Sequence, residues 1–135
     1  MALMFAALLM AAGLPNYDSL NPAKDVILGR YTEELHACQN APQNGGLSSQ
    51  VQCMDEEVRR QDVALNAILQ KVMAHLDVPR RAALQTDQRQ WIKAREKSAR
   101  EAVDPQMIGA GVSLLYDQSY LDETIRRTIW LEKLR

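Results

Sequence analysis

Apolar residues recur at helical spacing through the middle of the chain. Between residues 51 and 76 they lie three, four or seven positions apart, which places them on one face of a long helix. The tripeptide Asp77-Val78-Pro79 interrupts this pattern, and a proline disfavours the helical conformation in the residue before it. Beyond the interruption the same face continues with Leu84, Trp91 and Ile92. The pattern therefore predicts a long antiparallel helical hairpin.

Polar residues interrupt the apolar stripes of both arms. In an antiparallel hairpin that turns between Val78 and Pro79, facing positions place Asp62 opposite Arg95. An ion pair would suit a half-buried seam, because an unpaired charge there is costly. The alternative is that both side chains point into solvent.

A shorter helix is expected before the hairpin. Asn21 is a suitable N-cap, and Pro22 suits a first helical turn. About three turns of one apolar face follow, made by Ile27, Tyr31, Leu35 and Cys38. A run rich in Asn, Pro and Gly then ends this helix.

The remaining helix boundaries follow from local signals. Ser49 and Gln52 form a capping box that would start the first hairpin arm. Asp104-Pro105 would stop the second arm near residue 103. A last helix is expected over about 112–134, and its adjacent Arg126-Arg127 is expected to be exposed.

The composition favours an all-α protein. The 135 residues suit one domain, and aromatic residues make up only 5% of the chain. The expected fold is a small bundle of about four helices built on the long hairpin, with one disulfide. The 16 basic and 17 acidic residues nearly cancel, without a basic stripe along the sequence. This balance argues against a nucleic-acid partner.

The first 13 residues are apolar and carry no charge. They match the apolar region of a secretory signal peptide, and Ala11-Ala12-Gly13 offers a cleavage site. No Lys or Arg precedes the apolar run, so the signal is atypical or the true start lies upstream. The alternative is a buried N-terminal helix. With a cleaved leader, residues 14–135 form the exported, periplasmic domain.

The two cysteines, Cys38 and Cys53, would lie at the facing ends of two helices. In an exported protein this placement predicts a disulfide. The chain-entropy model gives a loop of about 15 residues roughly 3 kcal/mol of stabilisation. The alternative is two free thiols in a cytosolic protein. A redox motif is not indicated, because the chain has no C-x-x-C.

No constellation of catalytic residues is visible. His36 and His75 have no nucleophile or carboxylate at a spacing that suggests a triad. Glycine-rich phosphate loops and clusters of metal ligands are also missing from the sequence. The sequence therefore predicts a non-enzymatic protein without a cofactor or a metal.

The order of several motifs resembles a known family. Cys38, Cys53-x-x-Glu56, Asp62-x-x-Leu65-Asn66 and Gln88-x-x-Trp91-x-x-x-Arg95 resemble the lysozyme inhibitor LprI-like family, as does Thr124-x-x-Arg127 in the last helix. The resemblance implies a small, exported, helical bacterial protein. It also implies that the motif residues in the hairpin specify the fold, namely Asp62, Leu65, Asn66, Gln88, Trp91 and Arg95.

One departure concerns a second cysteine pair that is typical of the family. Ser98-Ala99 and Ser119 occupy the corresponding places here. We therefore expect the C-terminal helix to be held by packing alone and to fray first.

The resemblance implies non-covalent binding to lysozyme or another peptidoglycan hydrolase. Since lysozymes are basic, the partner-binding residues are expected in an acidic patch. The candidates are Glu33, Glu34, Asp55, Glu56 and Glu57. The alternative function is an accessory or structural module of an envelope or secretion assembly.

Overall fold

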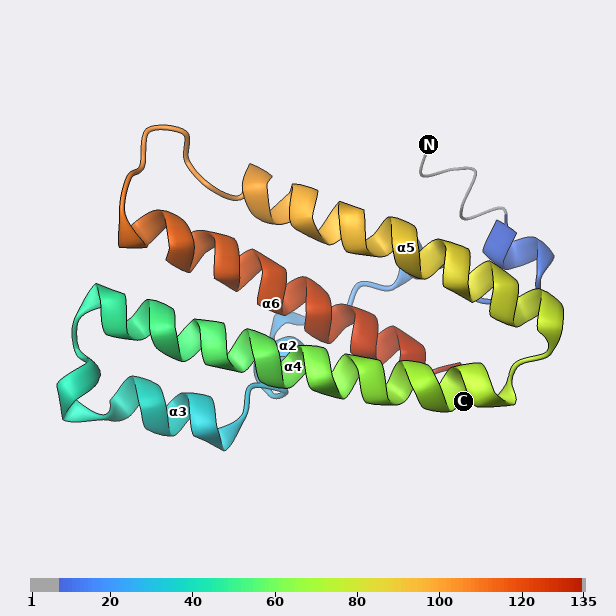
Figure 1. Cartoon of the computed structure of the whole chain (residues 1–135), viewed down its shortest axis with the longest axis horizontal. Coiled ribbons are helices and arrows are strands. Elements are labelled where there is room, and N and C mark those ends of the chain that lie inside the picture. Colours follow the sequence, from blue (N-terminus) through green and yellow to red (C-terminus); the bar gives the residue numbers. More distant parts are fainter. Residues whose placement is uncertain (1–7, 135) are drawn as a thin grey trace.

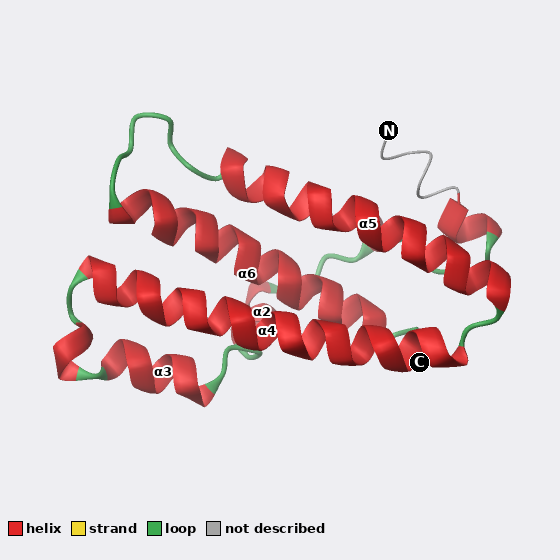
Figure 2. Ribbon diagram, viewed as in Figure 1, coloured by secondary structure: helices red, strands yellow, loops and turns green. Residues whose placement is uncertain are grey.

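The computed structural model describes residues 8–134, and within this range it is built of helices without a strand (Figures 1 and 2). Three long helices dominate, and the shorter elements precede them along the chain. In order they are η1 (Tyr17–Ser19), α2 (Lys24–Leu28), α3 (Glu33–Asn40), η2 (Pro42–Asn44), α4 (Leu47–His75), α5 (Val78–Glu101) and α6 (Ala110–Glu132). The all-α prediction is confirmed.

The predicted hairpin is present, and its turn lies where the sequence places it. Helix α4 ends at His75 and α5 begins at Val78, with Pro79 in its first turn. The side chain of Asp77 accepts a hydrogen bond from the backbone N–H of Arg80 at 3.0 Å. This N-cap satisfies one of the donors that a helix start leaves free.

The two arms of the hairpin touch through side chains, but their backbones are not closely packed on each other. Helix α6 lies between them and makes the closest backbone contacts with both α4 and α5 (Figure 1). It runs parallel to α4 and antiparallel to α5. The prediction of a two-helix apolar seam is therefore wrong in detail. Ile92, which was assigned to the seam, is 46% exposed because that side of α5 has no helix against it.

Helix α6 is the centre of the bundle. Its C-terminal half is buried nearly all round, from Leu121 to Leu131. One apolar cluster joins it to α4 and α5 through Val72, Leu84 and Trp91. A second cluster joins it to α3 and the start of α4 through Leu35 and Met54.

The first predicted helix is divided into two. Helix α2 ends at Leu28 and α3 begins at Glu33, with Thr32 as its N-cap. The Thr32 hydroxyl accepts a hydrogen bond from the N–H of Leu35 at 3.2 Å. The apolar spacing was correct over α3, but it did not show that Thr32 starts a new helix.

Helix α4 also begins earlier than predicted. Gly46 is its N-cap, so Ser49 and Gln52 lie inside the helix and form no capping box. The side chain of Gln50 instead donates to the carbonyl of Asn44 at 2.6 Å and ties the preceding loop to the helix. The ends of α5 and the start of α6 lie within two residues of their predicted positions.

Residues 1–7 of the predicted leader lie outside the described residues. Leu9 is buried in the same apolar cluster as Leu76 and Trp130. Among the described helices, none has the length and apolar character needed to cross a bilayer.

Candidate functional site

The motif ion pair of the hairpin forms as predicted. Arg95 Nη1 donates to Asp62 Oδ1 at 2.7 Å and to Thr124 Oγ1 of α6 at 3.0 Å. The Arg95 guanidinium lies between two aromatic rings, 4.5 Å from the centre of Trp91 and 4.0 Å from that of Tyr120. The solvent-exposed alternative is excluded for Arg95, which is buried. Arg95 therefore joins α5 directly to α4 through Asp62 and to α6 through Thr124.

A second buried arginine was not predicted. Arg127 was expected to be exposed, but its side chain is fully buried. It donates to Asp87 Oδ2 at 2.7 Å and to Gln88 Oε1 at 2.9 Å, both on α5. Burial lowers the pKa of Arg127, and Asp87 opposes that shift by stabilising the charge.

Aromatic rings surround the Arg127 guanidinium and complete its site. Trp130 and Tyr17 lie 4.3 and 4.7 Å from it, measured to the ring centres. Thr124 and Arg127 are three positions apart, so one face of α6 presents both Arg127 and the Thr124 partner of Arg95 to α5. Helix α6 is held by these contacts as well as by apolar packing, so the prediction that it relies on packing alone is wrong.

The other motif residues divide into buried and exposed members. Leu65, Gln88 and Trp91 are buried, and Trp91 donates its indole N–H to Glu123 at 3.1 Å. Asn66 is exposed. The buried members therefore shape the bundle, whereas Asn66 takes no part in the core.

The disulfide is present at the other end of α4. Cys38 and Cys53 are joined, with their Cα atoms 5.8 Å apart. The free-thiol alternative is excluded. Beside the disulfide, Gln50 and Asn44 tie the connecting turn by side-chain hydrogen bonds.

Glu57 does not belong to an exposed acidic patch. Its side chain is 0% exposed, and it accepts hydrogen bonds from the N–H of Thr32 at 2.8 Å and from the Thr32 hydroxyl at 2.6 Å. Arg60 and Gln61 donate to the same carboxylate. Burial alone would raise the pKa of Glu57, but these hydrogen bonds outweigh it and hold the pKa below its usual value. Glu57 fixes the start of α3.

The other residues of the predicted acidic patch differ in how far they are exposed to solvent. Glu33, Glu34 and Asp55 are exposed, and Glu56 is half-buried. Asp55 lies beside Asp117 of α6. Burial, followed by the nearby Asp55 carboxylate, raises the pKa of Asp117 to about 7. The Oδ2 atom of Asp117 is buried without a hydrogen-bond partner in the described structure.

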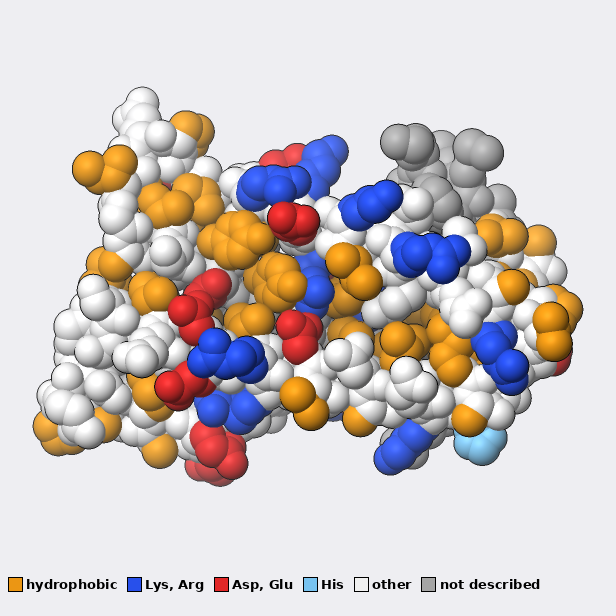
Figure 3. All heavy atoms as spheres, in the orientation of Figure 1, with side chains coloured by type: hydrophobic (Ala, Val, Ile, Leu, Met, Phe, Trp, Pro, Cys, Tyr) orange, Lys and Arg blue, Asp and Glu red, His pale blue; other side chains and the backbone are white. Residues whose placement is uncertain are grey.

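Asp55 and Asp117 belong to a surface that the sequence did not reveal. We name it the acidic–aromatic face, and it consists of Asp55, Asp62, Tyr116, Asp117 and Tyr120. The two tyrosines are half-exposed and stacked, with ring centres 6.0 Å apart. Figure 3 shows carboxylate side chains together with apolar surface over the left-hand parts of α4 and α6. The parallel packing of α4 and α6 creates this surface, so no local motif could have shown it.

An apolar loop borders the acidic–aromatic face. Met107 and Ile108 lie in the connection between α5 and α6, and Ile108 is 91% exposed. Tyr116 lies about 9 Å further along the axis of α6 than Ala110, because an α-helix rises about 1.5 Å per residue. The loop and the tyrosines therefore lie at the same end of the bundle (Figure 1).

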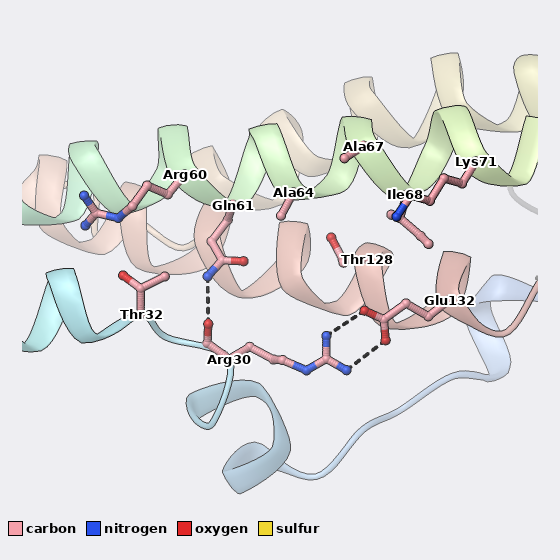
Figure 4. Close-up of a pocket in the computed structure, with 10 residues that line it drawn as sticks. All are labelled: Arg30, Thr32, Arg60, Gln61, Ala64, Ala67, Ile68, Lys71, Thr128 and Glu132. Atoms are coloured by element: carbon pink, nitrogen blue, oxygen red, sulfur yellow. Dashed lines mark hydrogen bonds and ion pairs between the residues drawn. The ribbon is translucent and has the colours of Figure 1, made fainter.

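A groove of about 450 Å³ lies between the α2–α3 connection, α4 and α6 (Figure 4). At its rim, Arg30 forms two hydrogen bonds to Glu132, at 2.8 and 2.9 Å. Gln61 donates to the Arg30 carbonyl at 2.8 Å. These groups bind one another and join the α2–α3 connection to α4 and α6.

Comparison with known families identifies the chain. Residues 38–131, from the first cysteine to the end of α6, match the family model described as lysozyme inhibitor LprI. The chain belongs to this family. No curated protein and no solved structure matches it. The LprI match spans both cysteines, the Asp62–Arg95 pair and Arg127, and it describes an inhibitor rather than an enzyme.

Proposed function

We propose that this chain is an exported inhibitor that binds a lysozyme-type peptidoglycan hydrolase non-covalently through the acidic–aromatic face. The single observation that carries the proposal is membership of the lysozyme inhibitor LprI family. The chemistry of the face supports the choice of surface. Lysozymes are basic, and a carboxylate-rich surface attracts a basic partner during encounter.

The face has the components of a protein-binding surface. Stacked tyrosines provide rigid apolar area, and tyrosine is enriched among the residues that dominate binding energy. Asp62 lies near Tyr120, and Asp55 lies beside Asp117, which is the residue next to Tyr116, so the face combines carboxylates with the rings. Contact between Tyr120 and the buried Arg95 guanidinium holds one of the rings in place. This part of the face is therefore largely formed before binding.

The loop of Met107 and Ile108 extends the proposed surface. Exposed apolar side chains at a loop tip can enter a concave site on a partner and bury area there. We place this loop at the edge of the interface and the tyrosine pair at its centre.

The test is lysis of bacterial cell walls by lysozyme in the presence of the purified protein. Wild-type protein is expected to slow lysis. Tyr116→Ala is expected to weaken inhibition by tenfold or more, because truncating a central aromatic residue typically costs about 2 kcal/mol. Val63→Ala is the matched control, since Val63 is an exposed apolar residue of α4 outside the face.

A second pair of variants distinguishes binding through the acidic–aromatic face from binding through the acidic patch predicted from the sequence. Asp55→Asn and Glu33→Gln each remove one exposed carboxylate. Only Asp55→Asn is expected to weaken inhibition. Lysis that continues unchanged at a large molar excess of wild-type protein would reject the proposal and favour the accessory-module function.

A further inference from the structure

The near-neutral charge of the chain conceals a separation of charge in the fold. Helix α5 contains seven of the 16 basic residues but only three of the 17 acidic residues. The rest of the chain therefore has an acidic excess. Figure 3 shows Lys and Arg side chains along the length of α5. These basic residues do not form a run in the sequence, because polar and apolar residues separate them along the chain.

Four of these cations lie on one side of α5. Arg89, Lys93, Lys97 and Arg100 are spaced by four, four and three positions, so they share one helical face. All four are exposed, and they lie opposite the buried side formed by Leu84, Trp91 and Arg95. We name this set the α5 basic stripe.

The charges of the stripe are only partly compensated. Lys97 and Arg100 pair with Glu101 and Glu96 of the same helix, at 3.8 and 3.1 Å. Such exposed pairs contribute little stability and exchange readily with other anions. Arg89 donates to the Thr86 hydroxyl, and neither Arg89 nor Lys93 forms an ion pair within residues 8–134.

Apolar side chains border the basic stripe. Ile92 is 46% exposed and lies on the flank of α5 beside the stripe, three positions from Arg89. The N-terminal turn packs against the first turns of α5, where Leu8 and Ala12 share a shallow apolar depression with Pro79 and Ala82. In this turn Leu8 and Met10 are 42% and 63% exposed. A soluble polyanion would bind the cations but would leave Ile92 in water, and in the uncleaved chain it would leave Leu8 and Met10 in water as well.

We propose that the outer side of α5 docks on an anionic phospholipid membrane surface. Lys and Arg would bind the headgroups, and Ile92 would enter the boundary between headgroups and acyl chains. The four cations all lie on α5, so docking through them does not depend on residues 1–13. The opposite side of α5 packs on α6, and docking would leave the carboxylates and tyrosines of α4 and α6 free for a partner.

The test is sedimentation of the full chain with vesicles. Wild-type protein is expected to bind vesicles containing phosphatidylglycerol at least tenfold more strongly than vesicles of phosphatidylcholine alone, and this binding should fall as salt is raised. The double variant Arg89→Gln/Lys93→Gln should lower binding to the anionic vesicles by about tenfold. The matched control Arg59→Gln/Lys71→Gln removes two exposed cations from α4 and should change it by less than about twofold.

Several outcomes would overturn the proposal. They are an equal loss of binding in the two double variants, equal binding to neutral and anionic vesicles, and binding to soluble polyphosphate with none to vesicles. Thermal unfolding of each variant identifies any loss caused by misfolding. Arg89→Gln/Lys93→Gln should leave inhibition of lysis intact, so failure here is distinguishable from failure of the proposed inhibitory function.

Discussion

Two regions of this bundle fix helix positions by different means. At the disulfide end, a covalent bond joins α3 to α4, and Glu57 holds the backbone and side chain of Thr32. Between α5 and α6 the described structure has no covalent link, and two buried arginines take that role. A disulfide acts mainly by restricting the unfolded chain, whereas a buried ion pair depends on both partners in the folded state. The two regions should therefore respond differently to loss of a single side chain.

The largest effect is expected at the buried arginines between α5 and α6. Asp87→Ala would leave the fully buried Arg127 without its carboxylate partner and should lower the free energy of unfolding by about 3–5 kcal/mol. Denaturant unfolding would measure it. Replacing both members, as in Asp87→Leu/Arg127→Met, should recover part of the loss because no buried charge remains. A cost below about 1 kcal/mol for Asp87→Ala would show that Gln88 and the aromatic rings compensate Arg127 without Asp87.

Loss of the disulfide should cost somewhat less. The double variant Cys38→Ser/Cys53→Ser opens a loop defined by a sequence separation of 15, and it should destabilise the protein by roughly 3 kcal/mol. Unfolding of wild-type protein with and without a reductant provides an independent measurement. The comparison between the two regions would be reversed if the cysteine variant proved less stable than Asp87→Ala.

The disulfide and the hairpin turn could be predicted from the sequence because their signals are local. Two cysteines allow only one pairing, and Asp77-Val78-Pro79 marks the turn at the opposite end of α4 by backbone chemistry alone. The Asp62–Arg95 pair was also predicted, because the hairpin register brings together opposite charges. Thr32 and Glu57 were not recognised as partners, because they lie 25 positions apart and the helix break at Thr32 has no strong local signal.

The burial of Arg127 between α5 and α6 could not be predicted from the sequence, because its signals are not local. Arg127 follows Arg126 in a polar stretch, and adjacent arginines usually mark a solvated face. Its burial depends on α6 lying between α4 and α5, which is a property of the tertiary arrangement. The same arrangement brings Asp55 beside Asp117. The face that we propose therefore shares Asp55 with the acidic patch predicted from the sequence, whereas Tyr116, Asp117 and Tyr120 come from α6.

A smaller loss of stability is expected for Asp62→Ala, and it should still exceed that of Asp55→Ala. Asp62→Ala removes the carboxylate partner of buried Arg95, but Asp62 is itself 35% exposed and Thr124 and the two rings remain. We expect a loss of about 1–2 kcal/mol. Asp55→Ala removes a carboxylate that faces another carboxylate, so it should be neutral or slightly stabilising. Equal losses in the melting temperatures of the two variants would contradict this assignment.

The smallest effect concerns pH, to which two carboxylates, Glu57 and Asp117, should respond with opposite signs. Glu57 has a lowered pKa, so its contribution is complete above about pH 5 and is lost in acid. Asp117 has a pKa raised to about 7 in the folded protein, from an ordinary value of 3.8. The folded state therefore binds more protons than the unfolded state between these values. Stability from this group should fall as pH rises from about 4 to about 7 and then remain constant.

The variant Asp117→Asn tests this sign directly. Subtracting its unfolding free energy from that of wild-type protein at each pH isolates the contribution of Asp117. Wild-type protein should lose about 1 kcal/mol relative to the variant across this interval, because solvent screens a partly exposed carboxylate pair. A difference that does not change between about pH 4 and pH 7 would show that Asp117 is already ionised and that Asp55 and Asp117 do not share a proton. The acidic–aromatic face would then carry its full negative charge throughout this range.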